Sequence, residues 1–266
     1  MDLNLEGKVA IVTGGSRGIG KSIARQLARE GVDVAIAARH IRALQETARE
    51  ISGETSRKVV AISADTGDDN EVEKMIQRVA NELGRIDILV NNAAVPGGQG
   101  QVPNMFQITN EVFWEDVNVK VMGYLRCVRG VVPYMKKQGW GRIINISGMA
   151  ARQTGSIVGS IRNVSVSAMT KNLADELGTY GINVTVVHPG ATRTERTPGL
   201  VKERSHDLGI SAEEVEQNMF QSNSVNRIID ASEVAYVVTF LASPKSSAIN
   251  GDAIAAGGGI SSSIYY

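Results

Sequence analysis

The sequence lacks several features that would restrict the protein to particular partners. Its 266 residues include a single cysteine, Cys127, which excludes an internal disulfide bond and a metal site built from several cysteines. Its 28 basic residues balance its 28 acidic residues, so there is no basic field for nucleic acid and no polybasic tract for a membrane. The longest apolar runs, such as residues 236–242, are too short to span a bilayer. We therefore expect a small-molecule substrate and no nucleic acid, membrane or metal.

The amino-terminal segment also lacks a targeting signal. Residues 1–7 contain two acids and no long apolar segment, unlike a secretory signal peptide. This feature and the single cysteine favour a cytoplasmic protein. With 42% hydrophobic and 21% charged residues, the composition is that of a globular protein and excludes a disordered or fibrous chain.

Short β-branched segments alternate with longer segments of helical periodicity along the whole chain. Strands are predicted at residues 8–13, 33–37, 59–63, 86–91, 142–147, 182–188 and 252–256. Helices are predicted at residues 18–30, 42–51, 68–83, 110–136, 157–179 and 232–242. Several of the strands are apolar on both faces, as parallel strands covered by helices must be. The alternation therefore predicts right-handed crossovers and a parallel sheet in one α/β domain.

Two stretches are less regular than the rest. Residues 96–103 are rich in Gly and Gln, and residues 191–226 are polar, charged and long. In a compact domain, a long segment of this kind is more often a functional lid than a plain connection. We therefore expect residues 191–226 to form a lid that shapes the substrate pocket.

Glycine is abundant, with 28 residues, and one cluster follows the first predicted strand. Residues 13–20 read TGGSRGIG and lead directly into the first predicted helix. Glycines at this place permit a tight turn and a close approach of the backbone, and the helix presents free N–H groups to a diphosphate. The predicted contacts with this diphosphate are Gly14, Ser16, Arg17, Gly18, Ile19 and Gly20.

The end of the second predicted strand indicates which nucleotide is bound. An NAD site usually has an acid there for the ribose hydroxyls, whereas this chain has the sequence AARH at residues 37–40. Arg39 and Arg17 together suit a 2′-phosphate, which guanidinium groups bind through charge-assisted, bidentate hydrogen bonds. The pattern predicts NADP(H) as the cofactor.

At this point the chain resembles the short-chain dehydrogenase/reductase family, over nearly its whole length. The motifs that carry the resemblance are the loop at 13–20, the sequence ADT at 64–66, NNAA at 91–94, VHPG at 187–190, and the closing segments 250–252 and 257–258. The resemblance implies a Rossmann-type, doubly wound parallel sheet over residues 1–266 as a single NADP-binding domain. The further cofactor contacts that it implies are Asp65, Thr66, Asn91, Ala93, Pro189, Gly190 and Thr192.

The catalytic pattern of this family is only partly present. The resemblance implies a site built from Asn, Ser, Tyr and Lys, in which the Lys lowers the pKa of the proton-donating Tyr. Asn118 matches the family Asn, and Ser147 matches the first serine after the fifth strand, but Gly148 stands where a second serine is expected. Asn118 and Ser147 are therefore the candidate catalytic residues.

The Tyr and Lys of the family have no counterpart. Alignment without gaps back from residues 170–190 places Gly159 at the Tyr position and Asn163 at the Lys position. Asn163 can still hydrogen-bond a ribose hydroxyl, so it remains a candidate cofactor contact. Gly159 leaves space where a phenol would stand. The acid would then come from Ser147, Ser160, Arg162, the substrate or a neighbouring chain.

Three functions remain compatible with this pattern. The first is an NADP(H)-dependent oxidoreductase with a divergent site that acts on a carbonyl or alcohol. The second is a non-catalytic NADP(H)-binding protein, such as a sensor or an assembly subunit, and the third is a lyase or epimerase. The resemblance also implies a homodimer or homotetramer formed through the helices around 113–135 and 157–179, which Tyr265 and Tyr266 would reach across. His188 ends a buried strand and is expected to serve packing.

Overall fold

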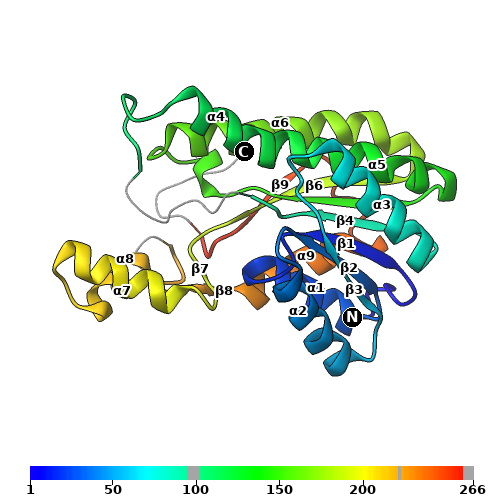
Figure 1. The fold of residues 1–266 in the computed structure, drawn as a ribbon, viewed down its shortest axis with the longest axis horizontal. Helices are drawn as coiled ribbons and strands as arrows, with labels where there is room; N and C mark the ends of the chain where they lie inside the picture. Colours follow the sequence, from blue (N-terminus) through cyan, green and yellow to red (C-terminus); the bar gives the residue numbers. More distant parts are fainter. Residues whose placement is uncertain (95–101, 221–222, 260–266) are drawn as a thin grey trace.

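A computed structural model describes residues 1–94, 102–220 and 223–259. Most of the predicted irregular stretch 96–103 lies outside these residues, as do Tyr265 and Tyr266. Seven parallel strands form the central sheet in the order β3-β2-β1-β4-β5-β6-β9 (Figure 1). Their bounds are β1 Val9–Thr13, β2 Asp33–Ala38, β3 Val59–Ser63, β4 Ile88–Asn91, β5 Gly141–Ile146, β6 Ile182–Pro189 and β9 Ala253–Ala256.

The strand order confirms the predicted Rossmann-type, doubly wound sheet in a single domain. From β1 the chain first runs outward to β2 and β3, and then returns to build β4, β5, β6 and β9 on the other side of β1. The order therefore reverses between β1 and β4. In sheets of this kind, the crevice beyond the carboxyl ends of the strands at the reversal is where ligands bind.

Helices cover both faces of the sheet (Figure 1). On one face lie α1 Gly18–Arg29, α2 Ile41–Thr55 and α9 Ala231–Ala242. On the other face lie α3 Asp69–Leu83, α4 Asn110–Val117, α5 Gly123–Gln138 and α6 Ile157–Leu177. In the part of the chain that the structure describes, none of the helices combines the length and the apolar character needed to cross a membrane.

The helix predicted at 110–136 contains a π-helical turn. Asn118–Met122 is π-helical and joins α4 to α5. A single π turn inside a helix is rare and frequently occurs at a functional site. In this turn Lys120 is the buried residue.

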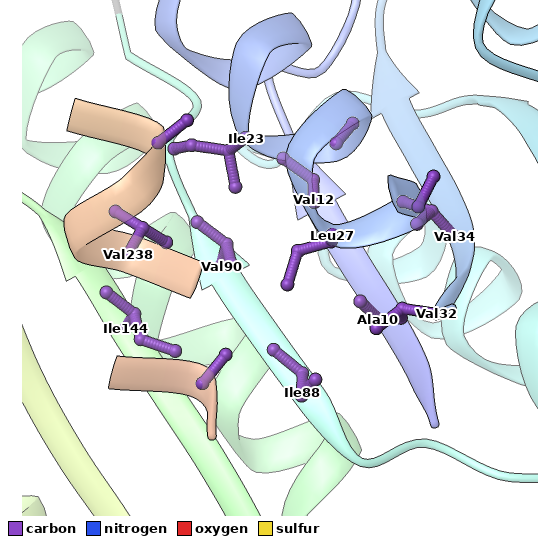
Figure 2. Close-up of a cluster of buried hydrophobic side chains, with 14 of the residues drawn as sticks. Ala10, Val12, Ile23, Leu27, Val32, Val34, Ile88, Val90, Ile144 and Val238 are labelled. Carbon is purple, nitrogen blue, oxygen red and sulfur yellow. The ribbon is translucent and has the colours of Figure 1, made fainter. Parts of the chain in front are cut away.

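Each central strand packs into two hydrophobic layers, because its side chains alternate between the two faces of the sheet. Ala10 and Val12 of β1 pack with Ile23 of α1 and with α9 (Figure 2), whereas Val9 and Ile11 pack with α3 and α5 on the opposite face. This burial on both sides explains the uninterrupted apolar character of the strand in the sequence. The glycine loop begins directly after this strand, at Gly14.

The segment 191–226 is more regular than predicted. A short strand inside the segment pairs in parallel with a second short strand that follows it. Two helices of the segment project beyond the sheet (Figure 1). These elements are β7 Thr192–Arg193, α7 Thr197–Leu208, α8 Ala212–Phe220 and β8 Ile229–Asp230. The expectation of an irregular stretch was therefore wrong for the residues that the structure describes here.

Local capping explains these two helices. Pro198 stands in the first turn of α7, and Gly209 ends the helix with φ +66°. At the start of α8, the Glu214 N–H donates to Ser211 Oγ at 3.1 Å, and the Ser211 N–H donates to the Glu214 carboxylate at 2.8 Å. This reciprocal pair is a capping box, which specifies a helix start even where the composition is polar.

Candidate functional site

A cavity of about 820 Å³ lies at the carboxyl edge of the sheet. Segments that follow β1, β2, β3, β4 and β6 line it, together with α7 and α8. The predicted cofactor residues that line it are Gly14, Ser16, Arg17, Gly18, Ile19, Arg39, Asp65, Thr66, Ala93, Gly190 and Thr192. The fold thus gathers, around one cavity, predicted contacts from both halves of the chain.

The glycine loop is closely packed. Gly14 has φ +66°, and a Cβ on Gly20 would lie 2.2 Å from the Gly14 carbonyl oxygen. Asn92 fixes the loop from the end of β4, because its amide donates to the carbonyl oxygens of Thr13 at 3.1 Å and Gly14 at 3.2 Å. The loop therefore holds its shape before any ligand arrives, and larger side chains at these glycines would disrupt it.

The amino terminus of α1 already binds an anionic group. The Gly18 N–H donates a 2.7 Å hydrogen bond to a carboxylate oxygen of Glu195, which lies between β7 and α7. This carboxylate stands where a diphosphate oxygen is expected, because N–H groups in the first turn of a helix have no partner within the helix. The loop therefore fits an anionic group at this place, as a dinucleotide would require.

Two cationic side chains lie at the predicted 2′-phosphate end. Arg17 and Arg39 are exposed and line the same cavity, and His40 follows Arg39 there. No acidic residue stands at the end of β2, where an NAD site would have one. The carboxylate of Asp65, on the neighbouring loop, accepts a hydrogen bond from the Gly67 N–H at 2.8 Å, which holds it in a turn.

The remaining predicted cofactor contacts lie beside the cavity rather than among its lining residues. Gly20 closes the loop from behind, and Pro189 ends β6. Asn91 is fully buried, and its amide donates to Asn145 on β5 at 3.0 Å. Asn163 is buried on α6. Their contact with a cofactor remains a prediction.

Ser147 and Asn163 lie together at the end of β5. The Ser147 hydroxyl donates to the Asn163 carbonyl oxygen at 3.1 Å and to its Oδ1 at 3.2 Å. A serine has only one hydroxyl proton. In this arrangement the proton points toward α6, so the hydroxyl would have to rotate before it could polarise a substrate carbonyl.

The residue that reaches Ser147 from the π-helical turn is Lys120, which sequence analysis missed. Its Nζ donates to the Ser147 carbonyl oxygen at 3.0 Å, and the residue is 4% exposed. Asn118 binds elsewhere: its amide nitrogen donates to the Gly67 carbonyl at 3.1 Å, and its oxygen accepts from Arg126 at 2.8 Å. In the sequence, Lys120 is a single lysine among apolar residues. Such a pattern does not by itself indicate a functional site.

Burial changes the protonation of the groups around Ser147. The pKa of Lys120 is lowered to about 7, first by burial and then by the charge of Arg162, while the charge of Asp116 opposes the shift. Burial, Arg152 and Lys120 together lower the pKa of His188 to about 4, so this imidazole is neutral at pH 7. His188 is 1% exposed, as a packing role requires.

None of the tyrosines in the described ranges 1–94, 102–220 and 223–259 lines the cavity. Tyr124 is fully buried and donates to the Ile146 carbonyl at 2.8 Å, and burial raises its pKa far above the usual value. Tyr134 packs in the core, Tyr180 lies under the Lys136 ammonium, and Tyr236 is exposed on α9. No described phenol is therefore placed to donate a proton into the cavity.

Gly159 lies close to the side chain of Ser156. A Cβ at this position would lie 2.8 Å from Ser156 Oγ, which caps α6 by accepting from the Gly159 N–H at 3.0 Å. A side chain at Gly159 would therefore first have to displace Ser156, and the space expected there for a phenol stays a prediction. Of the alternative acids, Ser160 donates to the Gln153 carbonyl at 3.2 Å, and Arg162 donates to both oxygens of Asp116.

A doubly wound parallel sheet with a glycine loop and an anion-binding helix start at its reversal defines a class of dinucleotide-binding proteins. The short chain dehydrogenase family matches residues 8–205 of this chain. The chain belongs to that family, the short-chain dehydrogenases/reductases.

Curated and solved relatives extend over almost the whole chain. The sequence is 33% identical to the 3-oxoacyl-[acyl-carrier-protein] reductase FabG of Staphylococcus aureus, over 95% of this chain and 98% of the relative. It is 29% identical to the NADPH-dependent reductase BacG of Bacillus subtilis, over 97% and 99%. The structure of L-sorbose reductase from Gluconobacter frateurii, complexed with NADPH and L-sorbose, superimposes with a TM-score of 0.92 at 28% identity, covering 99% of this chain and 100% of that one.

Proposed function

We propose that this protein is an NADP(H)-dependent oxidoreductase with a divergent active site, acting on a substrate of the carbonyl or alcohol class. The observation that carries the proposal is the cavity itself. It combines a glycine loop that carries Arg17, a helix start that binds an anion, and Arg39 directly after β2. BacG is named as NADPH-dependent, and the L-sorbose reductase structure contains NADPH, which supports the same cofactor here.

The residues of the chain have distinct parts in this proposal. When bound, the nucleotide would supply the hydride. The Gly18 N–H, once released from Glu195, would face the diphosphate, and Arg17 and Arg39 would hold the 2′-phosphate. Ser147, once its hydroxyl turns from Asn163, donates a hydrogen bond to the reacting oxygen.

Proton transfer is the weak step of the proposed reaction. Hydride addition to a carbonyl leaves an alkoxide that must gain a proton, and no described tyrosine reaches the cavity. Loss of a positioned general acid lowers a rate by ~10²–10⁴-fold. We therefore expect slow reduction of ordinary ketones and aldehydes, and faster turnover of a substrate that carries its own acidic group.

We further propose that residues 191–226 form the substrate lid. In the described part of this segment, side chains of α7 and α8 line the same cavity as the glycine loop, among them Leu200, Leu208 and Val215. Segments that close over a site in this way exclude water and complete the binding pocket. Hydrogen exchange with and without NADP⁺ tests the lid, which should gain protection when the nucleotide binds.

Self-association through the helical face opposite α1 is also part of the proposal. Trp114 of α4 is 63% exposed, and Ile161 and Val164 of α6 are 43% and 50% exposed. Exposed apolar side chains on these two helices are compatible with the predicted homodimer or homotetramer interface. Sedimentation analysis of the native chain measures the state directly.

The central experiment measures nucleotide binding and turnover separately. NADPH and NADH dissociation constants come from fluorescence titration, and turnover comes from NADPH absorbance over a panel of carbonyl compounds. Tight NADPH binding with slow turnover supports the proposal. Tight binding with no turnover on any compound indicates a non-catalytic binding protein, whereas failure to bind either nucleotide would refute the proposal.

A further inference from the structure

We propose that Lys120 is the cationic positioning residue of the active site, where it holds the end of β5 through Ser147 and places a titratable charge beside the nicotinamide. This inference rests on the proposed function, because it requires a nicotinamide nucleotide in the cavity. In this family a lysine is expected at the position that Asn163 occupies here, and Asn163 is neutral. Lys120 would supply the missing positive charge.

The geometry around Lys120 supports the assignment. The π-helical turn Asn118–Met122 directs this side chain inward, and its Nζ donates to the Ser147 carbonyl at 3.0 Å. The hydroxyl of the same serine donates to Asn163. Ser147 thus contacts both Lys120 and Asn163, the residue at the family's lysine position. Lys120 reaches this serine from a different helical segment than Asn163.

The surroundings also place Lys120 at the nicotinamide end of the cavity. Ser147, whose carbonyl oxygen Lys120 contacts, donates its N–H to the Val187 carbonyl oxygen at 2.8 Å, at the end of β6. The charge of Lys120 also acts on His188, which directly precedes Pro189 and Gly190, the motif expected to carry the nicotinamide. Val119 lines the cavity, and its carbonyl oxygen lies 3.4 Å from Thr66 Oγ1, whereas Lys120 is buried and contacts the end of β5.

The charges facing Lys120 from each surrounding element determine its protonation. Arg162 of α6 and His188 of β6 face it, and Asp116 of α4 forms an ion pair with Arg162 at 2.5 Å. Arg152 acts on His188 from the short helix after β5. Burial is the largest cause and the charge of Arg162 adds to it, so the pKa of Lys120 falls to about 7 although the charge of Asp116 raises it.

The redox state of the nucleotide provides a test that needs no substrate. The nicotinamide ring of NADP⁺ carries a positive charge, whereas that of NADPH does not. A protonated Lys120 beside the ring disfavours NADP⁺ selectively. The 2′-phosphate titrates in both forms, so its effect cancels in the ratio of the dissociation constants of NADP⁺ and NADPH.

We expect this ratio to fall between about pH 6 and about pH 8 by roughly three- to tenfold, the effect of one nearby charge in a partly polar interior. Lys120→Met should give a low ratio at every pH, and Lys120→Arg, which stays protonated, a high ratio at every pH. Lys171→Met, which removes an exposed lysine of α6, is the matched control and should behave as the native protein does.

Each outcome of the titration decides the question. A native ratio that does not change with pH, or a pH dependence that survives in Lys120→Met, would overturn the role of Lys120. If Lys120→Met fails to fold, the native protein and Lys120→Arg still give the comparison between a titrating and a permanent charge. Absence of binding by both nucleotides refutes the proposed function instead, so the two failures are distinguishable.

Discussion

Glu195 should compete with the diphosphate of the nucleotide, so its removal should tighten NADPH binding. Its carboxylate accepts the 2.7 Å hydrogen bond from the Gly18 N–H, at the start of α1. A diphosphate can use that N–H only after the carboxylate leaves. Glu195→Ala removes the competitor from the free protein and removes one negative charge from the approach of the ligand.

The magnitude follows from the nature and exposure of this contact. A hydrogen bond to a charged group contributes about 1.5–3 kcal/mol, and the helix dipole adds about 0.3–1 kcal/mol for an anion at a helix start. Glu195 is exposed, so water solvates the released carboxylate and screens the charge. We therefore take about 1 kcal/mol, which corresponds to roughly a fivefold lower NADPH dissociation constant.

Fluorescence titration with NADPH at low ionic strength measures the effect. Glu195→Gln, which keeps a hydrogen-bond acceptor without the charge, should fall between the native protein and Glu195→Ala. Glu203→Ala removes an exposed acid from α7 and is the charge-matched control, with native affinity expected. Unchanged or weaker binding by Glu195→Ala would refute the competition and indicate that Glu195 belongs to the bound state.

Three further outcomes are expected. Arg39→Ala should raise the NADPH dissociation constant about tenfold and leave that of NADH unchanged, since a charge-assisted bond to the 2′-phosphate is lost; equal effects on the two nucleotides would contradict this role. The double variant Gly159→Tyr with Asn163→Lys should increase carbonyl reduction, measured by NADPH absorbance, but lower the melting temperature, because the new side chain displaces the cap Ser156. Either change alone should do little, because a tyrosine without the lysine keeps a pKa of about 10. Asp87→Asn should lower the free energy of unfolding by about 2 kcal/mol in urea titrations, because this buried carboxylate accepts bonds from the Val9 N–H and from the Arg85 guanidinium.

Local signals in the sequence were sufficient for most of the fold. The strands at 59–63 and 33–37 and the helix at 68–83 were predicted within a residue or two, because apolar periodicity and caps such as Asp68 act over a few residues. The helices within 191–226 were missed for the opposite reason. Their surfaces are largely polar, so they lack a clear apolar periodicity. The capping residues were the main indication of the two helices, and the polar composition of the segment favoured an irregular structure instead.

The sequence by itself also predicted the cofactor end of the site. The glycine loop and the arginine after β2 are short contiguous motifs, and the function proposed for them follows from backbone geometry and charge at those places. Only the tertiary structure could show that Glu195 occupies the start of α1, 177 positions along the chain from Gly18. Only it could bring Lys120 against Ser147, because that contact depends on the π-helical turn and on the packing of α5 against β5. Contacts between distant segments depend on the relative placement of whole elements, which no local pattern in the chain records.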